Sequence, residues 1–107
     1  MENKVHYFYV LWCHDNTFYA GYTTNLKRRE QEHNQGIGAK YTRPEYRRPL
    51  QMMHSESFET RSLAMQAEAA FKKLTRPQKI VYLEEKGVFP PDNAPLWKKK
   101  AGESNDR

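Results

Sequence analysis

The beginning of the chain alternates short apolar segments with turn residues. Residues 6–12 form a continuous run of aromatic and β-branched side chains, which predicts a buried strand. Residues 14–16 carry turn chemistry, and residues 17–20 begin a second strand that we expect to end at Gly21. The pattern therefore predicts a β-hairpin.

The length of the hairpin loop decides which face each side chain occupies. A three-residue loop at 14–16 places Tyr19 opposite Leu11, with Tyr9 as its diagonal neighbour on the same face. A two-residue loop would put the two tyrosines on opposite faces. Any site that uses both tyrosines requires the three-residue loop.

The next segment predicts a polar helix that begins after Thr23 or Thr24 and runs to about Asn34. Its only apolar residue is Leu26, so the pattern alone predicts a solvated lid. If the face of Leu26 packs inward instead, it takes with it the residues at i+3 and i+7, Arg29 and His33.

The second half of the chain predicts one more strand, at 50–55, and two helices. Thr60 can cap the first helix, which should face the core with Leu63, Ala67, Phe71 and Leu74. Glu68 lies at the edge of this stripe, where an acid is costly unless it binds a cation or pairs, for example with Lys72 at i+4. Pro77 suits the first turn of the second helix, which should end near residues 86–87.

Together these elements predict an α+β fold, with a small three-stranded, mainly antiparallel sheet flanked by about three helices. We expect one domain over residues 1–87 and an irregular, proline-rich and polar C-terminal tail over residues 88–107. The features that indicate the tail are Pro90, Pro91, Pro95 and the run Lys98–Lys100.

Composition narrows the class of protein. Hydrophobic residues make up 37% of the chain and the mean hydropathy is −1.04, so the core must rely on large aromatic side chains. No apolar run approaches the roughly 20 residues that span a bilayer, and the N-terminal residues do not resemble a signal peptide. Cys13 is the single cysteine, which excludes an internal disulfide. We expect a cytoplasmic protein without a membrane segment.

Positive charge is concentrated in two places. The net charge is +5; residues 26–48 contain seven basic and three acidic residues, and residues 72–79 contain four basic residues and no acid. Clustered cations among aromatic residues favour a polyanionic partner, most simply nucleic acid and especially DNA. The candidate contacts are Arg28, Lys40, Tyr41, Arg43, Lys72, Lys73, Arg76 and Lys79.

The order of hairpin, basic helix, strand and acid-bearing helix resembles the GIY-YIG nuclease superfamily, in particular its small, stand-alone, single-domain bacterial branch. Residues 7–9 stand at its first motif, without its glycine and isoleucine, and residues 19–21 stand at the second. Residues 38–42 and 72–79 resemble the stand-alone branch. The resemblance implies five catalytic residues: Tyr9, Tyr19, Arg29, His33 and Glu68.

The resemblance also implies an activity. We expect a divalent-metal-dependent endonuclease that hydrolyses DNA with little sequence specificity, with DNA repair or recombination as one role. Glu68 would bind Mg²⁺ or Mn²⁺, because Mg²⁺ accepts few protein ligands, and no small-molecule cofactor is expected. Arg29 would bind phosphate, Tyr19 would act as the base, and Tyr9 would position groups. His33 would bond a phosphate oxygen or Tyr9.

Two other functions remain open from the sequence. One is a nucleic-acid-binding module of the same fold with weak or no catalysis, because Ile80 stands where several relatives have asparagine. The other is a protein-interaction domain whose basic surface meets an acidic partner. A zinc site is excluded, because Cys13 and the four histidines lack the paired spacing of zinc ligands.

Overall fold

The computed structural model describes residues 4–89. Along the chain these residues form β1 (His6–Trp12), β2 (Phe18–Thr23), α1 (Leu26–Asn34), the 3₁₀ helix η1 (Glu45–Arg47), β3 (Gln51–Phe58), α2 (Arg61–Lys72) and α3 (Arg76–Glu85). β1 lies in the centre of an antiparallel sheet with the strand order β2-β1-β3. The predicted α+β class, with three strands and three α-helices, is confirmed.

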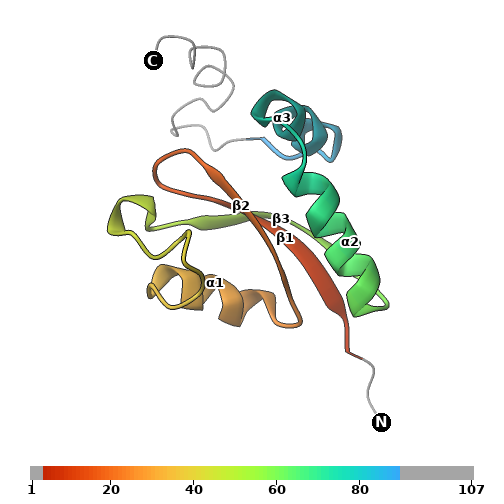
Figure 1. The fold of residues 1–107 in the computed structure, drawn as a ribbon, viewed down its shortest axis with the longest axis horizontal. Coiled ribbons are helices and arrows are strands. Elements are labelled where there is room, and N and C mark those ends of the chain that lie inside the picture. Colours follow the sequence, from red (N-terminus) through yellow and green to blue (C-terminus); the bar gives the residue numbers. More distant parts are fainter. Residues whose placement is uncertain (1–3, 90–107) are drawn as a thin grey trace.

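The sheet separates two regions of the core, because successive side chains of β1 point to opposite faces. Phe8, Val10 and Trp12 pack with side chains of α2 and α3, such as Phe71 and Leu83. Tyr9 and Leu11, which lie between them on β1, face α1 and cluster with Cys13 and Leu50. Figure 1 shows this layering, with α1 on one side of the sheet and α2 on the other.

The hairpin has the register that a joint tyrosine site requires. Leu11 pairs with Tyr19, and the amide of Cys13 donates to the carbonyl of Thr17 over 2.8 Å, so the loop covers residues 14–16 and is the three-residue alternative. The predicted end of the second strand at Gly21 was wrong. β2 continues to Thr23, and Gly21 pairs with Tyr9 in the middle of the ladder.

Helix α1 is not the solvated lid that its polar sequence predicts. Its N-cap is Asn25, whose side chain accepts from the amide of Arg28, so the capping role predicted for Thr23 or Thr24 was wrong. Thr23 instead accepts from the amide of Asn25 over 3.0 Å and so shapes the turn before the helix. His33 is fully buried on the inner face of the helix.

Polar side chains attach α1 to the chain that enters β3. Oδ1 of Asn34 accepts from the amide of Leu50 over 2.7 Å, and its Nδ2 donates to the carbonyl of the same residue over 3.0 Å. One turn earlier, Oε2 of Glu30 accepts from the amide of Met52 over 2.8 Å. Hydrogen bonds thus replace the apolar stripe that α1 lacks.

Both later helices begin where the sequence predicts. Thr60 caps α2, and Thr75 caps α3 through a reciprocal capping box with Gln78. The predicted inward face of α2 was wrong at Leu63, whose residue surface is 46% exposed. Ala64 is fully buried in its place, because a small side chain lets the helix lie close to the sheet.

The remaining boundaries differ modestly from the predictions. The third strand extends to Phe58 rather than ending at residue 55, with an irregularity where it passes Val10 and Leu11 of β1. Val88 packs against the core and, like Phe89, has no regular structure, whereas residues 90–107 of the predicted tail lie outside the described part of the chain. Within residues 4–89, no helix has the length and apolar character needed to cross a bilayer.

Replacing Asn34 with alanine tests whether hydrogen bonds hold α1 in place. Asn34→Ala removes the partners of both backbone groups of Leu50, a residue that is buried. We expect the free energy of unfolding to fall by about 1–3 kcal/mol, measured by urea denaturation. Gln31→Ala, on the exposed side of the same helix, should change it by less than about 0.5 kcal/mol. Equal effects of the two substitutions would contradict this account.

Candidate active site

A chain of hydrogen bonds crosses from β1 to α1 and on to the loop behind it. Oη of Tyr9 lies 2.9 Å from Nε2 of His33, and Nδ1 of His33 lies 2.7 Å from Oγ1 of Thr42. The Thr42 hydroxyl donates to the carbonyl of Ala39, so its oxygen accepts from Nδ1–H of His33. Nε2 is then the acceptor for the Tyr9 hydroxyl. All three side chains are fully buried.

Arg29 joins this chain from one turn earlier on α1. Its Nε donates to Oη of Tyr9 over 3.4 Å, its Nη1 to Oε1 of Glu32 over 2.9 Å, and its Nη2 to the carbonyl of Gly38 over 2.7 Å. Three of its five N–H groups are therefore engaged. The guanidinium is held at the end of the Tyr9–His33 pair, with its side chain 28% exposed.

Two glycines allow these groups to approach the backbone. A Cβ atom on Gly21 would lie 2.4 Å from Oη of Tyr9, and one on Gly38 would lie 2.6 Å from Nδ1 of His33. Both distances are far shorter than van der Waals contact allows. Glycine is therefore required at both positions for the side chains of Tyr9 and His33 to fit.

The environment keeps both buried groups neutral near pH 7. Burial raises the pKa of Tyr9 to about 12, despite the opposing hydrogen bond and charge of Arg29. Burial, together with the charge of Arg29, lowers the pKa of His33 to about 4. Tyr9 is therefore a phenol that donates to a neutral imidazole, an arrangement suited to positioning rather than to removing a proton.

Tyr19 covers the same imidazole from β2. The ring centroids of Tyr19 and His33 lie 5.2 Å apart, and the side chain of Tyr19 is only partly buried. Of the two tyrosines predicted to be catalytic, Tyr19 is thus the one with access to solvent. The structure brings together four of the five predicted catalytic residues through direct contacts: Tyr9, Tyr19, Arg29 and His33.

The fifth residue, Glu68, reaches the cluster from α2. Its side chain is 16% exposed, and its Oε2 lies 2.8 Å from Nζ of Lys72. The same Nζ lies 5.5 Å from the ring centroid of Tyr19. Burial raises the pKa of Tyr9, and the charges of Tyr19 and then Glu68 add to this rise. Glu68 is therefore largely shielded from solvent and is connected to the Tyr19 side of the cluster through its ionic partner Lys72.

The donor set at Glu68 fits a hard cation with few protein ligands. Within residues 4–89, no group of three His, Cys, Asp or Glu side chains converges, so Glu68 would be the single carboxylate ligand. Mg²⁺ and similar ions accept such sites, because water and substrate phosphate complete their shell. The ammonium of Lys72 shows that a positive charge is already accommodated beside this carboxylate.

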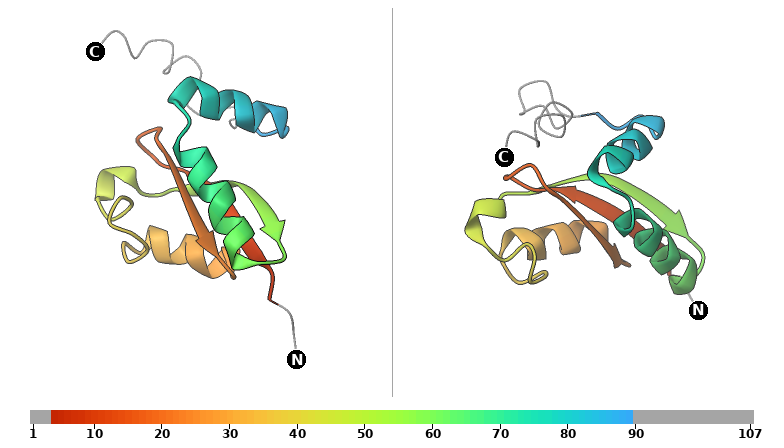
Figure 2. Two further views of the ribbon diagram at one scale, coloured as in Figure 1. Left: turned by 45° about the vertical axis from the view of Figure 1, so that its right-hand side comes forward. Right: turned by 45° about the horizontal axis from the view of Figure 1, so that its top comes forward.

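The two basic segments predicted from the sequence lie near each other. Burial, then the charges of Arg76 and Lys72, lower the pKa of Lys79, so these three cations share one region at the junction of α2 and α3. Arg76 interacts electrostatically with Tyr41 of the loop after α1 and with Asp15 of the hairpin turn. Figure 2 shows the hairpin turn between these segments.

The other predicted contact residues are exposed, but they differ in position. Lys40, Arg43 and Lys73 are exposed, in the loop after α1 and at the end of α2. Arg28 is also exposed, and its nearest described ionic partner is Glu32 on the same helix, at 3.6 Å. Arg28 is therefore not drawn into the cluster.

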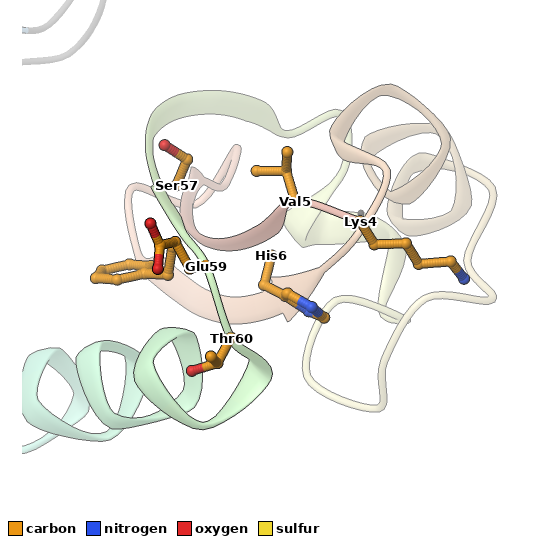
Figure 3. A pocket seen from close by; sticks show the side chains of 7 residues that line it. Lys4, Val5, His6, Ser57, Glu59 and Thr60 are labelled. Atoms are coloured by element: carbon orange, nitrogen blue, oxygen red, sulfur yellow. The ribbon is translucent and has the colours of Figure 1, made fainter. Parts of the chain in front are cut away.

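A hollow of about 770 Å³ lies elsewhere, at the start of β1 and the end of β3. Figure 3 shows its lining side chains, which come from residues 4–6 and 57–60. None of the five predicted catalytic residues lines it. The hollow is therefore separate from the hydrogen-bonded cluster.

Comparison with known proteins decides the family. The family model described as the GIY-YIG catalytic domain matches residues 5–81, which include the whole cluster. The chain belongs to the GIY-YIG family. The predicted resemblance is thus confirmed, and the family is one of nucleases with nucleic acid as substrate.

GIY-YIG relatives of similar size are known from bacteria. A UPF0213 protein of Enterococcus faecalis is 66% identical over 85 residues, covering 78% of this chain and 97% of that protein. YazA of Bacillus subtilis is 55% identical over 86 residues, covering 80% and 85%. The solution structure of EF2693 from E. faecalis is similar, with 64% identity, a TM-score of 0.55 and coverage of 81% of this chain and 92% of that one.

Several residues that build this GIY-YIG site have no role predicted from the sequence. Thr42 and Glu32 orient His33 and Arg29, while Gly21 makes room for Tyr9 and Gly38 for His33. Each of these contacts forms only in the folded chain. Ile80 is buried and packs in the core with Phe71 and Leu83.

The low pKa of His33 predicts a pH-dependent stability. The imidazole has a pKa of 6.5 in a free chain and about 4 here, so between these values the unfolded chain binds a proton that the folded chain excludes. The free energy of unfolding should fall as the pH drops through this window, by up to about 3 kcal/mol. Urea denaturation at several pH values between 7 and 4 measures this loss.

The variant His33→Gln isolates the contribution of the imidazole. It retains an amide near Tyr9 but cannot titrate, so its stability should depend less steeply on pH over the same range. If this variant does not fold, the NMR titration of the His33 ring in the unaltered protein gives the same information. A His33 pKa near 6.5 in the folded protein would contradict the prediction.

Proposed function

We propose that this protein is a divalent-metal-dependent endonuclease that hydrolyses phosphodiester bonds in DNA with little sequence preference. The observation that carries the proposal is the hydrogen-bonded Arg29–Tyr9–His33 chain, with the ring of Tyr19 against it and Glu68 linked to Tyr19 through Lys72. A guanidinium, two phenols and one carboxylate in one place suit phosphoryl transfer to water better than acyl transfer or redox chemistry.

Each residue has a role that follows from its surroundings. Arg29 is held by Glu32 and Gly38 so that its remaining N–H groups are available to a phosphate. Tyr19, partly exposed, removes a proton from the attacking water. Tyr9 and His33 are buried and neutral, and they keep Arg29 and the Tyr19 ring in position.

Glu68 would hold the cation, with water and phosphate oxygens as the other ligands. When bound, such a cation supplies charge stabilisation for the oxygens of the phosphate. In the structure, Lys72 is the ionic partner of Glu68. We infer that Lys72 then turns to the DNA backbone, because its side chain is 48% exposed and the neighbouring cations already favour an anion.

The affinity for DNA would come from contacts with the phosphate backbone of the DNA. The cations at residues 72, 76 and 79, with Lys40 and Arg43 of the loop after α1, contact phosphate and carry no base-reading geometry. Such binding is weakly sequence-specific and weakens steeply with salt. A domain over residues 1–87 would be sufficient for this activity, and we assign DNA repair or recombination as the process that uses it.

A binding module without catalysis is the second candidate. Ile80 supports it, because a buried aliphatic residue supplies no polar contact to the carboxylate or the substrate. In that case the same basic surface would bind DNA and no metal-dependent nicking would occur. The two candidates make opposite predictions for one variant of Glu68.

Glu68→Ala should abolish metal-dependent cleavage while preserving DNA binding. Nicking of supercoiled plasmid with Mg²⁺ or Mn²⁺ should fall on the order of 100- to 1,000-fold, because the cation loses its protein ligand. Binding measured with EDTA should change less than about twofold. Glu85→Ala, which removes an exposed carboxylate from α3, serves as the control and should retain activity. Unaltered protein that binds DNA but never nicks it with either metal would establish the binding module.

Lys72→Gln tests the competition between lysine and metal for Glu68. Removing the ammonium should tighten Mn²⁺ binding by about two- to fivefold, because an ion pair this exposed is worth at most about 1 kcal/mol. Mn²⁺ affinity is measured by electron paramagnetic resonance. Lys73→Gln removes the same charge one residue later and should have a smaller effect. Weaker Mn²⁺ binding by Lys72→Gln would refute the competition.

A further inference from the structure

A row of planar groups leads outward from Tyr19 to the surface. The rings of Tyr19 and Tyr41 are stacked, with centroids 5.8 Å apart and planes 21° from parallel. Cζ of Arg47 lies 3.9 Å from the centroid of Tyr41 and 5.0 Å from that of Tyr46. We call Tyr19, Tyr41, Arg47 and Tyr46 the stacked row. It connects the candidate active site to the loop before β3.

Hydrogen bonds of Arg47 hold the stacked row in place. Nε of Arg47 donates to Oδ2 of Asp15 over 3.0 Å, and its Nη1 donates to the carbonyl of Tyr41 over 3.0 Å. The amide of His14 also donates to the carbonyl of Arg47 over 3.0 Å. These bonds fasten the loop before β3 to the hairpin turn. A ligand that uses the row therefore meets groups that are already ordered, which lowers the entropic cost of binding.

The outer end of the row is open. Tyr41 lies between Tyr19 and Arg47, whereas Tyr46 contacts Arg47 and is 61% exposed, against 37% for Tyr41. The bonds from Arg47 to Asp15 and to the carbonyl of Tyr41 hold the loop without the ring of Tyr46. An exposed aromatic ring that contributes little to the core is suited to stack against a ligand.

Several basic side chains belong to the segments that carry or adjoin the row. Lys40 and Arg43 are exposed in the same loop, and Arg76 interacts electrostatically with Tyr41 and with Asp15 across the hairpin turn. Phosphate-binding cations beside stacked aromatic rings form the usual combination in proteins that bind single-stranded nucleic acid.

We propose that the stacked row is a base-stacking platform and that the protein acts on DNA strands whose bases are unpaired. Tyr46 stacks against one base of the strand whose phosphodiester lies at Tyr19 and Glu68. Bases inside a duplex are already stacked on both faces and cannot pack against a side chain without leaving the helix. The platform therefore selects single-stranded or locally unpaired DNA. The inference rests on the proposed function and specifies its substrate.

The test is a binding measurement in EDTA, where no cleavage occurs. Three fluorescent DNA probes of equal charge are compared by anisotropy: a single strand, a hairpin duplex, and a single strand whose sugars carry no bases. The unaltered protein should bind the single strand most tightly. Tyr46→Ala should weaken that binding about tenfold, to about the affinity of the unaltered protein for the strand without bases. Its affinity for the other two probes should not change. Tyr46→Phe keeps the ring and should bind like the unaltered protein.

Two controls separate stacking from general effects. Phe89→Ala removes another exposed aromatic ring, 63% exposed and outside the row, and should not alter binding to any probe. Lys40→Gln removes a phosphate contact and should weaken binding to all three probes alike. The platform is refuted if Tyr46→Ala affects all probes equally or none, or if the duplex binds as tightly as the single strand.

The outcome is distinguishable from failure of the proposed function. Ring-dependent binding of the single strand, without metal-dependent nicking in the Glu68 experiment, would support the platform and reject the endonuclease. Nicking that depends on Glu68, with binding indifferent to Tyr46, would support the endonuclease and reject the platform.

Discussion

The hydrogen bond between Tyr9 and His33 connects the fold of this protein to its candidate chemistry. The two residues are 24 positions apart, on β1 and α1, and neither is exposed. A buried hydroxyl or imidazole without a hydrogen-bond partner lowers the free energy of unfolding about as much as a large core substitution. Only an arrangement with α1 against the sheet provides a partner for both side chains. The requirement is strict, since the backbone must come as close as glycine permits at positions 21 and 38. The polar helix is thereby held by the same groups that form the site.

This dependence explains why the site is polar on one face of the sheet and the core apolar on the other. The face toward α2 and α3 packs Phe8, Val10 and Trp12 in the ordinary way. The face toward α1 has few apolar partners on the helix, and its stability comes from satisfied hydrogen bonds instead. A network of this kind is stabilising only when complete, so the catalytic candidates and the structural residues are selected together.

The position of β2 at the edge of the sheet completes the cluster. Helices α1 and α2 cover opposite faces, yet the ammonium of Lys72 on α2 approaches the ring of Tyr19 on β2. An edge strand allows side chains from both layers to meet beside it. Glu68 can therefore contribute a carboxylate to groups that α1 and β1 hold from the other side. The stacked row extends the same edge outward toward the solvent.

The sequence alone determined the features that depend on neighbouring residues. The cap at Thr60, the place of Pro77 in the first turn of α3, the three strands and the spacing of the family residues are all local or nearly so, and each was predictable. Other features were decided only by the tertiary structure. Helix α1 packs through Glu30 and Asn34, and Leu63 faces solvent. Thr42 fixes the tautomer of His33, and Arg47 stacks with Tyr41 and Tyr46. The reason is physical: a cap or a turn is settled within four residues, whereas a polar side chain gains from burial only when a partner distant in the chain arrives at hydrogen-bonding distance.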